Sequence, residues 1–137
     1  MISHEIFHTL HQLSRHLTNK QNEALKPAGL YSSQWAVIYV LKQKGSLTQK
    51  QLCDYLSVEA PPMTRTIQRL VKQGYVKQLP GQDKREKHVQ LTDEALSQYS
   101  NWEKIVSDVN NGLLSQFPES SQKELFHLQK TWLKQLV

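Results

Sequence analysis

The sequence has little of what membrane, secreted and disulfide-bonded proteins depend on. Its 137 residues include one cysteine, so no intramolecular disulfide can form. The mean hydropathy is −0.59, and no apolar run approaches the roughly 20 residues that a membrane-spanning helix needs. The segment Met1 to Glu5 lacks the basic and apolar regions of a secretory signal. These absences predict a single cytoplasmic domain, residues 1–137, that has no membrane partner.

Signatures of common enzyme classes are also missing. The chain contains no glycine-rich phosphate loop, no His-Glu-x-x-His zinc motif, no Gly-x-Ser-x-Gly nucleophile turn and no cysteine pair. The sequence therefore predicts a protein that is not an enzyme and that needs no cofactor.

The stretch from Gly45 to Leu91 carries the most specific pattern. A capping box over Thr48–Gln51 opens a short helix. A second helix is expected over residues 60–73, because prolines fit its first turn and a glycine follows its last. Two alternating runs, 75–79 and 87–91, flank a loop and predict a β-hairpin. This order of elements is that of a winged helix-turn-helix, in which the hairpin forms the wing.

The expected second helix has two different faces. Its apolar positions, at helical spacing, are Met63, Ile67, Leu70 and Val71. Its polar face carries Thr64, Arg65, Gln68 and Lys72. Helix-turn-helix units place their second helix in the major groove of DNA, where such side chains bond base edges and phosphates. Taken alone, this face favours the alternative of an ordinary solvated helix beside an ordinary hairpin.

Charge is distributed unevenly along the chain. The segment 42–88 holds ten Lys and Arg against four Asp and Glu, a net charge of +6, whereas the remainder holds seven against eight. The chain's net charge of +5 therefore comes from the segment whose expected fold contacts DNA. A segregated basic surface is the electrostatic footprint of a phosphate-binding protein.

The regions around this core are predicted to be helical, which makes the fold mainly α with a small β-hairpin wing. One long helix is expected over 3–26, a helix capped by Ser32 runs to Gly45, a helix of about twenty residues follows the N-cap Thr92, and another spans 123–137. The terminal helices carry apolar stripes with no partner nearby in sequence. We expect them to form a homodimer, although a monomer with packed end helices is the alternative. The candidate dimerisation residues are Ile6, Leu10, Leu13, Leu125, Leu128, Trp132, Leu133 and Leu136.

A set of short motifs runs in order through residues 29–92. They are Gly29-Leu30, Gln34-Trp35, Leu47-Thr48-Gln49, Leu52, Leu56, Thr64-Arg65, Arg69-Leu70, Gly74, Asp83-x-Arg85 and Leu91-Thr92. In combination they resemble the MarR family (multiple antibiotic resistance regulators), with a core over 30–92 and dimerisation regions over 1–29 and 93–137. The resemblance implies a homodimeric, ligand-responsive transcription factor, usually a repressor, that binds a pseudo-palindromic double-stranded DNA operator. Glu59 departs from the pattern, because relatives often have Ser or Thr there as the helix N-cap.

The helix face and the resemblance together predict the DNA contacts. The candidates are Thr48, Gln49, Pro62, Thr64, Arg65, Gln68, Arg69, Lys72, Asp83, Lys84, Arg85 and Lys87. Arg85 is expected in the minor groove, with Asp83 holding its guanidinium as the family motif implies. Arg69 is expected to be partly structural, for example through an acidic group of the wing. Relatives often bind small aromatic or phenolic compounds between the dimer helices and the core, but no residue here identifies an effector.

Two other groups suggest different chemistry. His4, His8 and His11 share one helix face, which keeps a metal-sensing regulator as an alternative, although such spacing is also typical of a solvated face. Cys53 is predicted to pack as a small hydrophobe rather than act as a redox switch. A winged-helix module that binds another protein instead of DNA is a further alternative. The segregated positive charge argues against it.

Overall fold

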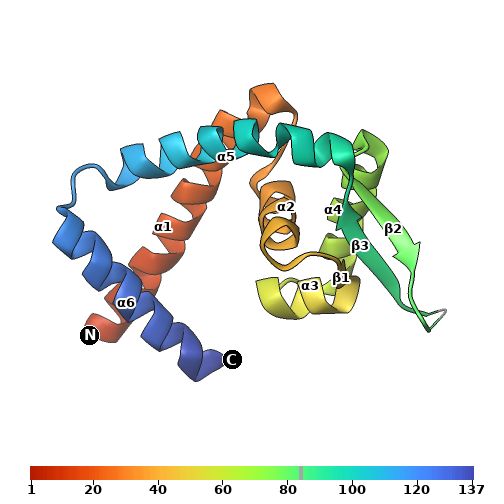
Figure 1. Ribbon diagram of the computed structural model, residues 1–137. Helices are drawn as coiled ribbons and strands as arrows, with labels where there is room; N and C mark the ends of the chain where they lie inside the picture. Colours follow the sequence, from red (N-terminus) through yellow and green to blue (C-terminus); the bar gives the residue numbers. More distant parts are fainter. Residues whose placement is uncertain (84) are drawn as a thin grey trace.

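The computed structural model describes residues 1–83 and 85–137. Within that part the chain is mainly helical, as predicted, with a small antiparallel sheet (Figure 1). The elements in chain order are α1 (Ile2–Leu25), the short 3-10 helix η1 (Lys26–Ala28), α2 (Ser32–Lys44), β1 (Leu47–Thr48), α3 (Gln49–Leu56), α4 (Ala60–Gln73), β2 (Val76–Pro80), β3 (Lys87–Leu91), α5 (Asp93–Leu114) and α6 (Glu119–Leu136).

The helix-turn-helix forms from the local signals in its sequence. The Thr48 hydroxyl accepts the backbone N–H of Gln51 at 3.1 Å, and the Gln51 side chain accepts the N–H of Thr48 at 2.9 Å, which completes the predicted capping box. Ser57 ends α3 in the left-handed conformation, with φ of +54°. Gly74 ends α4 with φ of +83°, a value that glycine adopts without strain.

The wing is a three-stranded sheet with the order β1-β3-β2. β2 and β3 form the predicted hairpin, in which Val76 faces Leu91 and Pro80 faces Lys87. The sequence analysis missed β1, because its two residues belong to the segment that opens the α3 capping box. β1 pairs Leu47 with Val89, so the wing is attached directly to the start of the helix-turn-helix.

Three boundary or burial predictions were wrong. Tyr31, not Ser32, is the N-cap of α2, because its backbone is extended, with φ of −107° and ψ of 159°, and its carbonyl oxygen accepts the N–H of Trp35 at 3.0 Å. α6 begins at Glu119 rather than at 123, since the polar residues after Pro118 form its first turn. Val71 was expected in the apolar face of α4 but is 42% exposed, because the buried stripe there is narrower.

The hydrophobic core lies between α2, α3, α4, the sheet and the first half of α5. Its fully buried members include Ile38, Leu52, Ile67 and Val89, one from each of α2, α3, α4 and β3. Trp35 stacks on Tyr99 with ring centroids 5.4 Å apart, which joins α2 to α5. α2 therefore forms the back of the winged core. We use "winged core" for residues 30–92 from here on.

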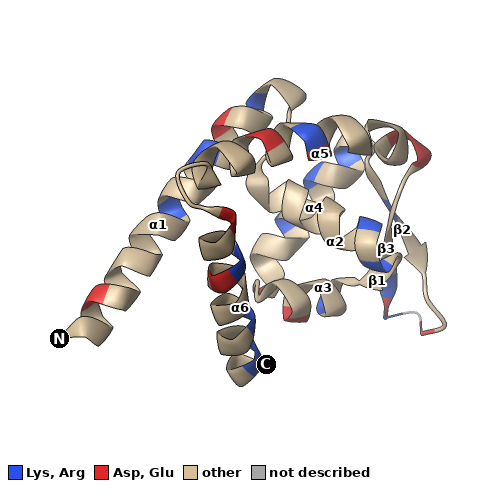
Figure 2. Cartoon of the chain, turned by 60° about the vertical axis from the view of Figure 1, so that its left-hand side comes forward, with Lys and Arg blue, Asp and Glu red and all other residues tan. Residues whose placement is uncertain are grey.

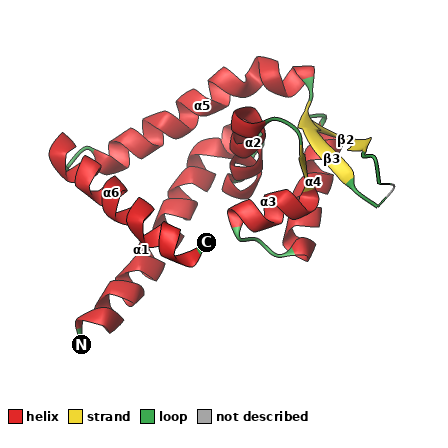
Figure 3. Cartoon of the chain, turned by 60° about the horizontal axis from the view of Figure 1, so that its bottom comes forward, coloured by secondary structure: helices red, strands yellow, loops and turns green. Residues whose placement is uncertain are grey.

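The long helices extend away from this core (Figures 1 and 3). α1 packs on α5 through its C-terminal part, where Gln21 donates a hydrogen bond to Asn110 at 3.1 Å. α6 crosses α1 near its N-terminal end, where Phe7 and Trp132 meet edge to face with centroids 5.6 Å apart. Within the described residues, no helix is both long and apolar enough to cross a membrane.

Candidate nucleic-acid interface

The outer face of α4 presents a cluster of long polar side chains. Arg65, Gln68, Arg69 and Lys72 are exposed and together line a shallow hollow of about 190 Å³. They lie on the face opposite Met63, Ile67 and Leu70, which are buried against the core. The amphipathic pattern of the sequence therefore sets which face of α4 is free for a partner.

Thr64 has a structural role that the sequence did not indicate, and its DNA contact stays a prediction. Its hydroxyl donates to the carbonyl oxygen of Ala60 at 2.9 Å and accepts from Gln49 Nε2 at 2.7 Å. These bonds use the hydroxyl proton and one of its acceptor sites within the protein. Thr64 and Gln49 therefore tie α3 to α4.

Arg69 contacts an aromatic ring instead of an acidic group of the wing. Its guanidinium carbon lies 5.9 Å from the centroid of the Tyr31 ring, within cation–π range. No ion pair of Arg69 occurs among residues 1–83 and 85–137. Tyr31 is exposed and sits at the start of α2, so it holds one basic side chain of α4 at the edge of the interface.

The wing tip is ordered by backbone contacts. The Asp83 carboxylate accepts the backbone N–H of Arg85 at 3.0 Å, whereas the family motif implied that it holds the guanidinium. No Asp83–Arg85 ion pair occurs in the described part of the chain. The N–H of Gly81 donates to the carbonyl oxygen of Glu86 at 2.9 Å and closes the loop. Lys84 lies outside the described residues.

The remaining predicted contacts lie at the start of α3, in the first turn of α4 and in the wing. Pro62 is exposed in the first turn of α4, and Lys87 is exposed on β3 at the base of the wing. Thr48 is half-buried and occupied as the N-cap of α3. Because β1 pairs with β3, Thr48 also links the helix-turn-helix to the wing.

Basic side chains of the winged core are not neutralised within the protein. The ion pairs found among the described residues are Lys20–Glu23, Lys104–Asp108 and Lys123–Glu119, all of them outside segment 42–88. Figure 2 shows blue Lys and Arg positions on α4 and the strands, whereas red and blue positions are mixed along α6. The positive charge that the sequence predicted is therefore available to an anionic partner.

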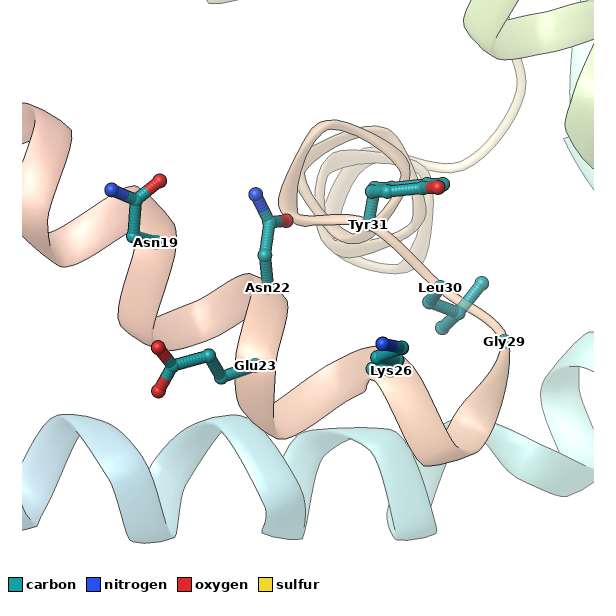
Figure 4. Close-up of a pocket in the computed structure, with 7 residues that line it drawn as sticks. All are labelled: Asn19, Asn22, Glu23, Lys26, Gly29, Leu30 and Tyr31. Carbon is teal, nitrogen blue, oxygen red and sulfur yellow. The ribbon is translucent and has the colours of Figure 1, made fainter.

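A second hollow, of about 550 Å³, lies where α1 turns into α2. It is lined by Asn19, Asn22, Glu23, Lys26, Gly29, Leu30 and Tyr31. Figure 4 shows Asn19 and Asn22 pointing away from α5, with Asn22 reaching the start of α2. Because Tyr31 belongs both to this hollow and to the contact with Arg69, the hollow lies next to the α4 face.

The histidines of α1 and Cys53 were the residues considered for other chemistry. No group of three or more His, Cys, Asp or Glu side chains that could hold a metal ion occurs among the residues described. Cys53 is half-buried against the core, and burial, with the nearby Asp54 carboxylate, raises the pKa of its thiol. A raised pKa lowers the thiolate fraction and so opposes oxidation chemistry.

Sequence reasoning missed one polar cluster beside the interface. Gln34 donates from Nε2 to Gln73 Oε1 at 2.6 Å, and Gln73 Nε2 donates to the carbonyl oxygen of Gly29 at 2.8 Å. Gln34 belonged to the motifs of the family resemblance, which was the available signal for its importance. Nothing in the local sequence marked Gln73 as its partner, because 39 residues separate the two.

Comparison with known proteins gives this arrangement a family. Residues 28–86 match the MarR family. The chain is also 41% identical over 134 residues to the uncharacterized HTH-type transcriptional regulator YwoH of Bacillus subtilis (strain 168), with 98% of each chain covered. The chain belongs to the MarR family. It is therefore an HTH-type transcriptional regulator and not an enzyme, as the sequence analysis predicted.

Other members of the MarR family support the same assignment. The multiple antibiotic resistance protein MarR of Escherichia coli (strain K12) is 32% identical over 96 residues, which cover 64% of this chain and 67% of that one. The crystal structure of a cysteine-to-serine mutant of MarR from E. coli, complexed with operator DNA, matches with a TM-score of 0.85 and 26% identity over 94% of each chain. A MarR transcriptional regulator from Methanosarcina mazei Go1 matches in fold with a TM-score of 0.90 and 24% identity, covering 98% of this chain and 96% of that one.

Proposed function

We propose that this protein binds a pseudo-palindromic DNA operator as a homodimer and represses transcription until a small effector binds. Arg65 and Gln68 are the base-reading side chains of α4, and Lys72 and Arg69 contact phosphate. Arg85 of the wing enters the flanking minor groove, where the negative potential favours a guanidinium. The two half-sites of the operator match the two-fold symmetry of the dimer.

The observation that carries DNA binding is the unpaired positive charge around the exposed face of α4. Arg65, Arg69 and Lys72 share one hollow and have no ion-pair partner in the described part of the chain. Neutralising phosphates with such side chains releases counterions and supplies most of the affinity of DNA-binding proteins. The operator complex of the related E. coli MarR mutant supports the same choice of partner.

Salt-dependent DNA binding tests this proposal. A duplex selected by the protein from a random DNA pool should bind more tightly than unselected DNA. Its logarithmic affinity should fall linearly with the logarithm of salt concentration. Binding that is insensitive to salt, or absent, would instead favour the alternative of a winged-helix module that binds another protein.

Homodimer formation is supported by the apolar faces of the terminal helices. The eight candidate dimerisation residues are between 37% and 72% exposed in the single chain. α6 has no buried residue. Exposed apolar stripes of this length mark an interaction surface, and an isologous pairing of terminal helices would leave two winged cores facing the same way. Light scattering at micromolar concentration should report twice the mass of the chain.

An effector site is proposed at the hollow lined by Tyr31. The hollow lies between α1 and the winged core, and one of its walls contacts Arg69 of the DNA-binding face. A small phenolic acid bound there would compete with Arg69 for the Tyr31 ring. Adding such a compound should weaken binding to the selected duplex in the wild type but not in Tyr31→Ala. Equal weakening in both proteins would place the effector elsewhere.

A further inference from the structure

The two ends of α4 are anchored to different parts of the molecule. At the N-terminal end, Thr64 accepts a hydrogen bond from Gln49 at 2.7 Å, which connects α4 to α3 inside the winged core. At the C-terminal end, the Gln73 side chain reaches the connection between α1 and α2. Its Nε2 donates to the carbonyl oxygen of Gly29 at 2.8 Å, and its Oε1 accepts from Gln34 Nε2 at 2.6 Å.

Gln34 determines where the Gln73 side chain is held at the C-terminal end of α4. It is 2% exposed, and no other amide side chain in the described residues is buried to this degree. Its Oε1 accepts the backbone N–H of Tyr31 at 2.8 Å, which leaves Nε2 to donate to Gln73. A buried amide that loses its partner is costly, so the Gln34 amide favours one placement of the Gln73 side chain.

α5 meets the same end of α4. The Thr92 hydroxyl donates to the carbonyl oxygen of Gly74 at 2.6 Å, and it also accepts the N–H of Ala95 as the N-cap of α5. The last turn of α4 is therefore bonded to the segment that follows α1 and to the start of α5. We call Gly29, Gln34, Gln73, Gly74 and Thr92 the α4 joint. Figure 1 shows α5 running from this end of α4 toward α6.

We infer that the α4 joint sets the angle at which α4, the recognition helix, is carried on the long helices, and that Gln34 and Gln73 are positioning residues for half-site spacing. The inference rests on the proposed function, because spacing matters only to a dimer that reads two half-sites. In that dimer, the angle of each α4 fixes the distance between the two recognition helices. Loosening the joint should leave the base contacts of each α4 intact while relaxing the distance between them.

The test measures binding to three duplexes. One is the duplex that the wild-type protein selects from a random pool, the second has the same half-sites moved apart by a base pair, and the third holds a single half-site. Gln73→Met removes both hydrogen bonds of the Gln73 side chain and keeps its length. We expect the affinity for the single half-site to stay within about twofold of wild type, and the affinity for the selected duplex to fall by about fivefold or more. The preference for the selected duplex over the duplex with separated half-sites should fall by the same factor.

Two further variants keep the result interpretable. Gln116→Met changes an exposed glutamine between α5 and α6, far from the joint, and should bind all three duplexes like the wild type. Gln73→Met leaves the buried Gln34 amide without its partner, which can lower stability by itself. The double variant Gln34→Met/Gln73→Met removes both amides, and it should show the same loss of spacing preference even if the single variant unfolds.

Several results would overturn the inference. An unchanged spacing preference in both folded variants would mean that the joint does not set the distance between the helices. An equal loss on the half-site and on the selected duplex would make Gln73 a local DNA contact. A wild-type protein that selects no sequence is a separate result, because it contradicts operator binding itself and removes the basis of the inference with it.

Discussion

The winged core and the terminal helices differ in how completely they bury their apolar side chains. In the winged core, α2, α3, α4 and β3 each contribute fully buried apolar side chains. In the terminal helices, α1 buries only Leu25 at its end and α6 buries nothing. One region therefore completes its hydrophobic centre within a single chain, and the other lacks a covering surface.

The same two regions differ in charge. Segment 42–88 has a net charge of +6, with no ion pair among its described residues, whereas the rest of the chain has a net charge of −1 and contains the three ion pairs found. Unpaired positive charge suits a polyanion, and an uncovered apolar face suits another apolar face. The two regions therefore suit two different partners, which we propose are DNA and a second copy of the chain.

The largest expected effect comes from placing a charge on the apolar face of the terminal helices. Leu133 is 59% exposed in the single chain, so Leu133→Asp should leave the isolated fold intact. In a dimer the carboxylate would be buried without a partner, which costs several kcal/mol. Light scattering should therefore show monomer at micromolar concentration, and affinity for the selected duplex should fall by about 100-fold or more.

The control for that prediction is Thr131→Asp, which puts the same charge on the polar side of α6. It should leave the dimer and the DNA affinity close to wild type. If both variants dissociate equally, charge on α6 rather than loss of an apolar contact is responsible. If neither dissociates, this face of α6 does not form the dimer.

Two leucine-to-alanine substitutions compare how much a buried and an exposed leucine contribute to the stability of the single chain. Leu52 of α3 is 0% exposed, so Leu52→Ala should lower the free energy of unfolding by about 2–5 kcal/mol through lost burial and a cavity. Leu128 of α6 is 57% exposed, so Leu128→Ala should change the unfolding of the monomeric Leu133→Asp background by less than about 0.5 kcal/mol. Urea titration measures both. Comparable losses would show that α6 has a core of its own within one chain.

Base reading and phosphate contact can be separated within the α4 face. Arg65→Ala should cost about 1–3 kcal/mol on the selected duplex and relax the preference at one base position per half-site. Lys72→Ala should weaken selected and random DNA alike and lower the salt slope by about one unit per protomer. Fluorescence anisotropy on both DNA types distinguishes them. If Arg65→Ala also weakens both DNA types equally, Arg65 contacts phosphate instead.

The fold was predictable from sequence where the signals are local. The capping box at Thr48, the glycine after α4 and the alternating runs of the hairpin each specify one conformation within a few residues. The order of these elements indicated a winged helix-turn-helix, and the family resemblance then implied a homodimeric transcription factor that binds an operator. These features needed no knowledge of contacts between distant parts of the chain.

The site was less predictable, because its geometry depends on distant contacts. Two of its contacts join residues 38 or more positions apart, namely Gln34 with Gln73 and Tyr31 with Arg69. No helical or strand period in the sequence can indicate contacts over such a distance. Thr64 shared the polar face of α4 with Arg65 and looked equally free. Its short side chain instead bonds the neighbouring helix, whereas the longer side chain of Arg65 extends into solvent.

The smallest predicted effect concerns the wing, where Asp83 places a negative charge beside Arg85. In the structure its carboxylate accepts the backbone N–H of Arg85 at 3.0 Å and so holds the turn that presents this residue. Asp83→Ala removes a negative charge from a DNA-facing loop but also removes this hydrogen bond. Because the bond orders the wing tip, we expect binding to the selected duplex to weaken by about 0.5–1.5 kcal/mol.

Two control variants decide which property of Asp83 matters. Asp83→Asn keeps a side-chain oxygen that can accept the Arg85 N–H, so it should restore most of the affinity or exceed it. Glu86→Ala removes a nearby charge whose carboxylate forms no hydrogen bond in the described residues, and it should tighten binding slightly at low salt. Charge alone predicts tighter binding for all three variants. If Asp83→Ala binds as tightly as Glu86→Ala, the hydrogen bond has no role in DNA binding, and the wing acts only as a diffuse positive surface.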